Sequence, residues 1–219
     1  MMNLKDYKLY ILDYDGSLLD SMPMWKNSAS SFVKYLGYYP KEDLDDRIPV
    51  FTDRECGMVL KEEYHLEWDI DTIMKMIDEY VDIEYAKVKL KDGALDFLKK
   101  LKALDKKVVL LSASGDHILN ISLNSLGIKD YFDEVISTYN HETLSKVTGT
   151  AIVHLLEKYN LQNNEALIID DALSTILSAK RLGVDSIAIY DDFTSNHHED
   201  ELEGNALLYL KMSELNDLF

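Results

Sequence analysis

The stretch Leu9-Tyr-Ile-Leu-Asp-Tyr-Asp-Gly-Ser-Leu-Leu-Asp-Ser21 decides what kind of fold this chain adopts. Its first four residues, Leu9–Leu12, are all apolar, which is typical of a strand buried on both faces of a parallel sheet. Asp13 and Asp15 follow at once, and Gly16 then allows the chain to turn. The pattern therefore predicts two carboxylates at the carboxyl edge of a sheet, where open α/β sheets bind their ligands.

Two carboxylates this close in sequence have two interpretations. Asp and Gly are the commonest turn residues, so the pair could simply form a turn after the strand. Alternatively the two acids share a site, where they repel each other unless a cation or a proton intervenes. Mg²⁺ suits such a site because it prefers hard oxygen ligands and bridges readily to phosphate. One carboxylate can then act as a nucleophile and the other as a general acid and base.

The composition limits the classes of partner. The 219 residues carry a formal net charge of −17, so the chain has no general attraction for nucleic acid or for an anionic membrane. An anionic substrate would also be repelled unless a bound divalent metal and a few lysines offset this field. No apolar run approaches the roughly 20 residues of a membrane span, and the N-terminus lacks the apolar core of a signal peptide. Because Cys56 is the single cysteine, no intrachain disulfide can form, and we expect a cytoplasmic protein.

Apolar strands alternate with amphipathic helices in the second part of the chain. Helices are predicted at 92–104, 117–126, 148–159 and 173–182, and strands at 107–111, near 131–136, and at 165–169, 186–190 and 206–210. This alternation is typical of a parallel, doubly wound α/β sheet. The acidic segment 196–203 is predicted to be a solvated loop.

Residues 22–88 show helical patterns and no convincing strand. Apolar positions recur at helical spacing between Met24 and Leu36, and further helices are predicted at 51–64 and 70–85. We therefore expect an α/β core domain formed by residues 1–21 and 89–219. An all-helical cap domain, residues 22–88, would be inserted after the first strand.

Polar residues also follow the later strands of the predicted sheet. Ser112 ends the second strand, and Asp170 and Asp171 end a later one. Lys146 lies just before the helix that leads to that later strand. Each has an ordinary explanation by itself, because Ser112 or Ser114 and the two aspartates could cap helices and lysines are common on surfaces. Their joint occurrence, in order, at the ends of parallel strands indicates one site.

In these motifs the chain resembles the haloacid dehalogenase superfamily of hydrolases. The first motif of that family, Asp-x-Asp-Gly-Thr followed by Leu-x-Asp-Ser, is matched by 13–21. The second, a Ser or Thr after an apolar strand, is matched by Ser112, and the third, a Lys ahead of a helix, by Lys146. The fourth, an acidic cluster before a helix with Ala-Lys-x-x-Gly, is matched by 170–184. The resemblance covers nearly the whole chain. It implies a Rossmann-like core with a helical cap, as in the phosphatase group that includes phosphoglycolate phosphatases and β-phosphoglucomutases.

The resemblance also implies a two-step hydrolysis of a small phosphorylated metabolite. Asp13 would attack phosphorus and form an aspartyl-phosphate. Asp15 would protonate the leaving oxygen and then activate the water that cleaves the intermediate. Ser112, Ala113 and Lys146 would bind the phosphoryl oxygens.

A Mg²⁺ ion is the cofactor that the resemblance implies. It would be held by Asp13, by the main-chain carbonyl of Asp15, and by Asp171 together with Asp170. The electrostatics agree independently, since crowded carboxylates need a cation and the developing charge needs fixed donors. The protein would act as a monomer or small homo-oligomer, with no nucleic-acid or membrane partner.

The chain departs from the family pattern at three positions. Ser17 replaces the usual Thr of the first motif, Val147 follows Lys146 where Pro is usual, and Thr175 stands where a further acid is common. None of these positions carries a central role in the implied mechanism.

Two other functions are compatible with the same fold. The β-phosphoglucomutases carry a His twelve residues after the nucleophile, but Trp25 occupies that position here and has no proton to shuttle. A non-catalytic binding protein of the family would normally have lost Asp13 or Asp15, and both are present. The sequence therefore favours a phosphatase over either alternative.

Overall fold

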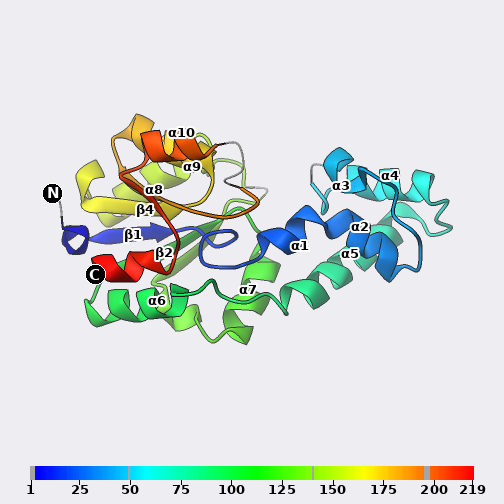
Figure 1. Cartoon of the computed structure of the whole chain (residues 1–219), viewed down its shortest axis with the longest axis horizontal. Helices are drawn as coiled ribbons and strands as arrows, with labels where there is room; N and C mark the ends of the chain where they lie inside the picture. The colour runs from blue at the N-terminus through cyan, green and yellow to red at the C-terminus, as the bar shows by residue number, and fades with distance from the viewer. Residues whose placement is uncertain (1–2, 49, 140, 195–197) are drawn as a thin grey trace. The chain divides into compact units, whose positions relative to one another are not determined.

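The computed structural model describes residues 3–48, 50–139, 141–194 and 198–219, and these form two compact units (Figure 1). The first unit comprises the chain through Asp20 together with Lys89–Phe219, and the second comprises Ser21–Val88.

The first unit is built on a six-stranded sheet in which every neighbouring pair is parallel. The strand order is β3-β2-β1-β4-β5-β6, so the chain winds outward from β1 in one direction and then returns to wind in the other. The strands are β1 (Leu9–Leu12), β2 (Lys107–Ser112), β3 (Glu134–Ser137), β4 (Ala166–Asp170), β5 (Asp185–Ile189) and β6 (Leu208–Leu210). This confirms the predicted parallel, doubly wound sheet.

Helices cover both faces of this sheet, with α8, α9 and α10 on one side and α6 and α7 on the other (Figure 1). Their bounds are α6 (Ala94–Ala103), α7 (Asp116–Ser125), α8 (Thr150–Tyr159), α9 (Leu173–Leu182) and α10 (Glu199–Asn205). Short 3₁₀ helices occur at η1 (Leu4–Asp6), η2 (Lys129–Tyr131), η3 (Asn163–Glu165) and η4 (Glu214–Leu218).

The apolar run of β1 is buried on both faces because successive side chains point in opposite directions. Leu9 and Ile11 pack in a cluster with Leu155 of α8. On the other face, the ring of Tyr10 lies against Phe219, with ring centroids 5.9 Å apart. The central strand is therefore anchored from both layers, and its carboxyl end is held in place.

The second unit contains helices and no strand among its described residues, 21–48 and 50–88. The helices are α1 (Met22–Lys26), α2 (Ser28–Tyr35), α3 (Leu44–Arg47), α4 (Arg54–Glu63) and α5 (Ile70–Tyr85). An aromatic cluster joins α2 to α5, because Phe32 of α2 packs against Tyr80 of α5 and also against Phe51, which precedes α4.

Two main-chain hydrogen bonds join the chain where it leaves the first unit to the place where it returns. The amide of Asp20 donates to the carbonyl of Lys89 (3.0 Å), and the amide of Lys91 donates to the carbonyl of Leu18 (2.9 Å). The exit and entry segments are thus paired side by side at the edge of the first unit.

Two local expectations were wrong. The helical pattern from Met24 to Leu36 is divided between α1 and α2, because the side chain of Asn27 donates to the carbonyl of Pro23 (2.8 Å) and interrupts the helix. The expected loop at 196–203 is helical from Glu199, where α10 begins, while residues 196–197 lie outside the described residues. Buried Leu202 anchors α10 to α9 and β5, and the three acids in its first turn favour the positive end of the helix dipole.

No helix within the described ranges is both long and apolar enough to cross a membrane.

The packing of α8 against the sheet makes a first prediction. Replacing the fully buried Leu155 with Ala should lower the free energy of unfolding by about 2–5 kcal/mol, because the change leaves a cavity between helix and sheet. Val153→Ala on the solvent side of the same helix is the control and should change stability by about 0.5 kcal/mol or less. Urea unfolding should be followed by circular dichroism, since Trp25 and Trp68 both lie in the second unit. Equal effects of the two substitutions would contradict this account of the core.

Candidate active site

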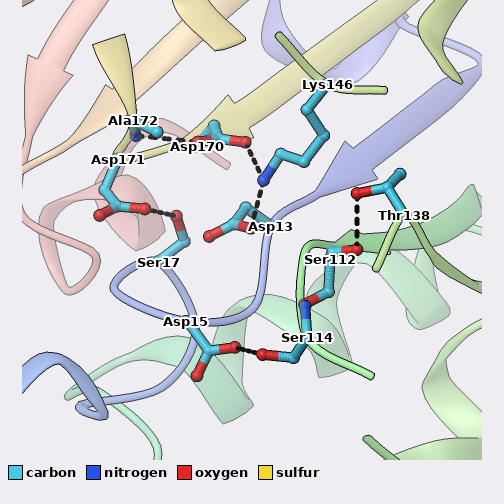
Figure 2. Close-up of polar contacts among 10 residues, drawn as sticks. All are labelled: Asp13, Asp15, Ser17, Ser112, Ser114, Thr138, Lys146, Asp170, Asp171 and Ala172. Atoms are coloured by element: carbon cyan, nitrogen blue, oxygen red, sulfur yellow. Dashed lines mark hydrogen bonds and ion pairs between the residues drawn. The ribbon is translucent and has the colours of Figure 1, made fainter. Parts of the chain in front are cut away.

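The candidate site lies at the carboxyl end of β1, between the ends of β2 and β4. The chain winds in opposite directions on the two sides of this point, which is where open α/β sheets form their binding crevices. Asp13 directly follows β1, and its amide donates to the carbonyl of Ile169 in β4 (2.9 Å). Asp170 ends β4 and Asp171 follows it. The sheet thus brings together acids that are far apart in the sequence (Figure 2).

Lys146 lies between two of these acids. Its Nζ is 2.5 Å from Oδ1 of Asp13 and 2.6 Å from Oδ2 of Asp170, and all three side chains are buried. Burial alone would lower the pKa of Lys146, but the two carboxylates more than offset this and hold its pKa above the ordinary value. The ammonium therefore stays charged and fixes the orientation of both acids.

Asp171 completes a buried acidic cluster. Carboxylate oxygens of Asp13, Asp170 and Asp171 all lie within 4.8 Å of one another. Burial raises the pKa of Asp171 well above its ordinary value, and the neighbouring carboxylates of Asp13 and Asp170 raise it further. Burial also raises the pKa of Asp13, while the Lys146 ammonium acts in the opposite direction. One ammonium is therefore too little positive charge for three buried carboxylates.

The donor set of this cluster fits a hard divalent cation. Oδ2 of Asp13 is buried and has no hydrogen-bond partner among the described residues, so one strong acceptor in the cluster is unsatisfied. Three carboxylates supply the oxygen ligands that Mg²⁺ and Ca²⁺ prefer. Asp13, Asp170 and Asp171 are accordingly the residues that could hold such an ion.

The turn after β1 depends on a glycine. Gly16 has a φ of +84°, a conformation that L side chains rarely adopt, and a Cβ atom there would lie 2.3 Å from Oδ2 of Asp171. The next residue, Ser17, is buried and its hydroxyl donates to Oδ1 of Asp171 (3.2 Å). The turn therefore both approaches and orients the third acid, and Ser17 retains the hydroxyl that this contact requires.

The end of β2 carries a second group of polar contacts. The hydroxyl of Ser114 donates to Oδ2 of Asp15 (2.6 Å), and the amide of Ser114 donates to Oγ of Ser112 (3.0 Å). The hydroxyl of Thr138 donates to the carbonyl of Ser112 (3.2 Å). The side chain of Ala113, between the two serines, is exposed. Asp15 and Ser112 are thereby linked through Ser114 (Figure 2).

The structure therefore places the expected residues in two groups that meet at the end of β1. Asp13, Lys146 and Asp170 are in direct contact, and Asp171 lies beside them. Ser114 and Thr138 are contacts that the sequence did not assign. The possibility that a serine caps α7 is wrong, because the N-cap is Gly115 and no side chain bonds there. The one sequence signal for the contact with Asp15 was the position of Ser114, two residues after Ser112.

A family model for haloacid dehalogenase-like hydrolases matches residues 10–189, which is most of the chain. The chain belongs to the haloacid dehalogenase-like hydrolase family. The four motifs in the sequence and the Rossmann-like sheet agree with this assignment, which confirms the expected family and fold.

Curated relatives within this family are phosphatases. The chain is 24% identical over 200 residues to a phosphoglycolate phosphatase of Chromobacterium violaceum, covering 86% of this chain and 87% of the relative. It is 23% identical over 178 residues to a phosphorylated carbohydrates phosphatase of Thermotoga maritima, covering 81% and 82%.

Solved structures share the fold over nearly their whole length. A Thermotoga maritima protein provisionally assigned as a β-phosphoglucomutase has a TM-score of 0.82 at 21% identity, covering 96% of this chain and 97% of that one. CbbY from Rhodobacter sphaeroides, solved with phosphate, has a TM-score of 0.72 at 16% identity, covering 95% and 96%. At these identities the similarity establishes the fold.

The contact between Gly16 and Asp171 makes a second prediction. Added MgCl₂ should raise the melting temperature of the wild type, because an ion that binds only the folded state stabilises it. In Gly16→Ala this rise should be much smaller, because the new methyl group would displace the Asp171 carboxylate. Gly37→Ala is the control: its φ is +88°, but a Cβ there would meet nothing within 4 Å. A full Mg²⁺-induced rise in Gly16→Ala would contradict a cation site at these carboxylates.

Proposed function

We propose that this chain is a Mg²⁺-dependent phosphatase that hydrolyses a small phosphorylated metabolite through an aspartyl-phosphate. The observation that carries the proposal is the state of the Asp13 carboxylate. Lys146 holds its Oδ1, while its buried Oδ2 has no partner among the described residues. A nucleophile needs such an arrangement, in which one oxygen is held in place and the lone pairs of the other are not taken up by a protein donor. The names of the curated relatives support the same class of substrate.

The proposed reaction has two chemical steps, and each step uses residues of this site. Asp13 attacks phosphorus and displaces the leaving group, which takes a proton from Asp15. Asp15 next removes a proton from water as that water attacks the aspartyl-phosphate, which releases phosphate and the Asp13 carboxylate. The Ser112 hydroxyl, the Ala113 segment and the Lys146 ammonium bind the phosphoryl oxygens and offset their charge.

The cation would be held by Asp13, Asp171 and the main-chain carbonyl of Asp15, with Asp170 as a further ligand. When bound, it would supply positive charge that offsets the charge of the phosphoryl group and of these carboxylates. That charge matters in this chain because the overall charge of −17 repels a phosphate ester. The same charge would counteract the burial that raises the pKa of Asp13, and would therefore favour the ionised form of the nucleophile.

A phosphomutase is disfavoured by the residue that would shuttle its proton. Trp25 occupies that position, and its ring packs against Tyr85 with centroids 5.8 Å apart. Conversion of β-glucose 1-phosphate to glucose 6-phosphate in a coupled assay would reverse this ranking.

A non-catalytic binding protein is the other alternative. Such a protein would fail to form a BeF₃⁻ adduct at Asp13 when Mg²⁺ and BeF₃⁻ are soaked into crystals.

Removal of the nucleophile gives the direct test. Asp13→Asn should lower phosphate release from p-nitrophenyl phosphate and from a panel of metabolite phosphomonoesters by about 10³-fold or more, because the amide cannot form the acyl-phosphate. Asp130→Asn, an exposed acid of the same unit, should keep wild-type activity. Equal inactivity of wild type and Asp13→Asn across the whole panel would refute the proposal.

Metal removal gives an independent test. EDTA should abolish turnover and added MgCl₂ should restore it, because the acidic cluster repels phosphate when no cation is bound. Asp171→Asn should need on the order of tenfold more Mg²⁺ for half-maximal activity, since it loses one charged ligand. Activity that persists unchanged in excess EDTA would contradict metal dependence.

A further inference from the structure

We propose that Ser114 is a positioning residue that orients Asp15 for proton transfer, and this inference rests on the proposed phosphatase function. Its hydroxyl donates to Oδ2 of Asp15 at 2.6 Å, at the short end of the range for hydrogen bonds between oxygen atoms. The two residues come from different loops, one after β2 and one after β1. Such a bond restricts rotation of the carboxylate about its side chain.

Ser114 is itself held rigidly. Its amide donates to Oγ of Ser112 (3.0 Å), and its carbonyl accepts from the hydroxyl of Ser137 (2.8 Å). Oγ of Ser137 in turn accepts from the amide of Tyr139 (3.2 Å). The main chain at Ser114 is thus fixed from two sides before any substrate arrives, so its hydroxyl can act as a preorganised donor.

The same loop is tied to the neighbouring strand at Ser112. The carbonyl of Ser112 accepts from both the amide (2.8 Å) and the hydroxyl (3.2 Å) of Thr138, just beyond β3. The phosphoryl-binding serine and the serine that holds Asp15 are therefore parts of one braced segment, 112–114. A shift of this segment would misplace the phosphoryl group and the acid together (Figure 2).

A helix-capping role does not account for this serine. The N-cap of α7 is Gly115, and no side-chain capping bond is made there. The hydroxyl is directed instead across the site to a carboxylate on another strand end (Figure 2).

The orientation of Asp15 matters because this residue gives up a proton in the first step of the reaction and takes one up in the second. In the first step the bond between phosphorus and the leaving oxygen breaks, and the proton moves from Asp15 to that oxygen. In the second step a water proton moves to Asp15 as the water oxygen bonds to phosphorus and the bond to Asp13 breaks. Ser114 keeps its own proton throughout and only directs the carboxylate of Asp15.

The leaving group therefore provides a selective test. An alkoxide is a poor leaving group and needs the proton from Asp15, whereas p-nitrophenolate leaves with little proton assistance. In Ser114→Ala, kcat/KM for glycerol 2-phosphate and 2-phosphoglycolate should fall on the order of tenfold, as expected for loss of a hydrogen bond to a carboxylate. For p-nitrophenyl phosphate, kcat/KM should change by about twofold or less.

Two control variants and two further measurements on Ser114→Ala separate positioning from other roles. Ser114→Thr keeps the hydroxyl and should restore alkyl phosphate hydrolysis. Ser125→Ala removes a hydroxyl that donates to the main-chain carbonyl of Ser122 in α7, and it should leave both substrates unaffected. In Ser114→Ala, the loss should fall on kcat rather than appear as a raised KM, and the BeF₃⁻ adduct at Asp13 should still form.

The other outcomes are distinct. Equal losses on alkyl and aryl phosphates without rescue by Thr would show a merely structural role, and a change confined to KM would show a substrate contact instead. Either result, or an unaffected Ser114→Ala enzyme, overturns the positioning role while the wild-type activity upholds the phosphatase. A wild type that hydrolyses none of these esters refutes the proposed function and this inference with it.

Discussion

The rest of this structure depends on how the first unit tolerates three carboxylates buried at one sheet edge. Taking a charge out of water is costly, and unpaired buried charges are rarely retained. Here a single buried ammonium, that of Lys146, lies between Asp13 and Asp170, whereas the third acid, Asp171, accepts a hydrogen bond from the neutral hydroxyl of Ser17. Such a cluster stays anionic unless it takes up protons or a cation. Because the sheet itself brings these three carboxylates together, the folded first unit requires additional positive charge at this edge.

The order of the strands in the sheet determines where these polar groups come together. Because β1 pairs with β2 on one side and β4 on the other, the loops after all three strands meet. The left-handed turn at Gly16 lets the first loop approach Asp171 without a side chain in the way. The second loop is braced against the end of β3 through Thr138. Backbone geometry, rather than side-chain reach, therefore determines which polar groups come within bonding distance.

The sequence predicted those parts of the structure that local patterns specify. The expected helices at 70–85 and 173–182 coincide with α5 and α9, since the first has clear apolar periodicity and the second is stopped by Gly183. The acids at strand ends could be found because parallel strands place their carboxyl ends on one edge. Ser114 could not be assigned from the sequence, since its partner Asp15 lies on a loop that is distant in the chain. Helix α10 was missed because one buried residue, Leu202, outweighs a run of exposed acids.

The paired segments at Leu18–Asp20 and Lys89–Lys91 have a consequence for modularity. Hydrogen bonds join these two segments within the first unit. The sheet can therefore keep the same structure whether the chain between them is long or is only a short turn. The entropy of closing an inserted loop grows only slowly with its length. The segment 21–88 is therefore free to lengthen, shorten or be exchanged over evolutionary time while the acidic centre stays intact.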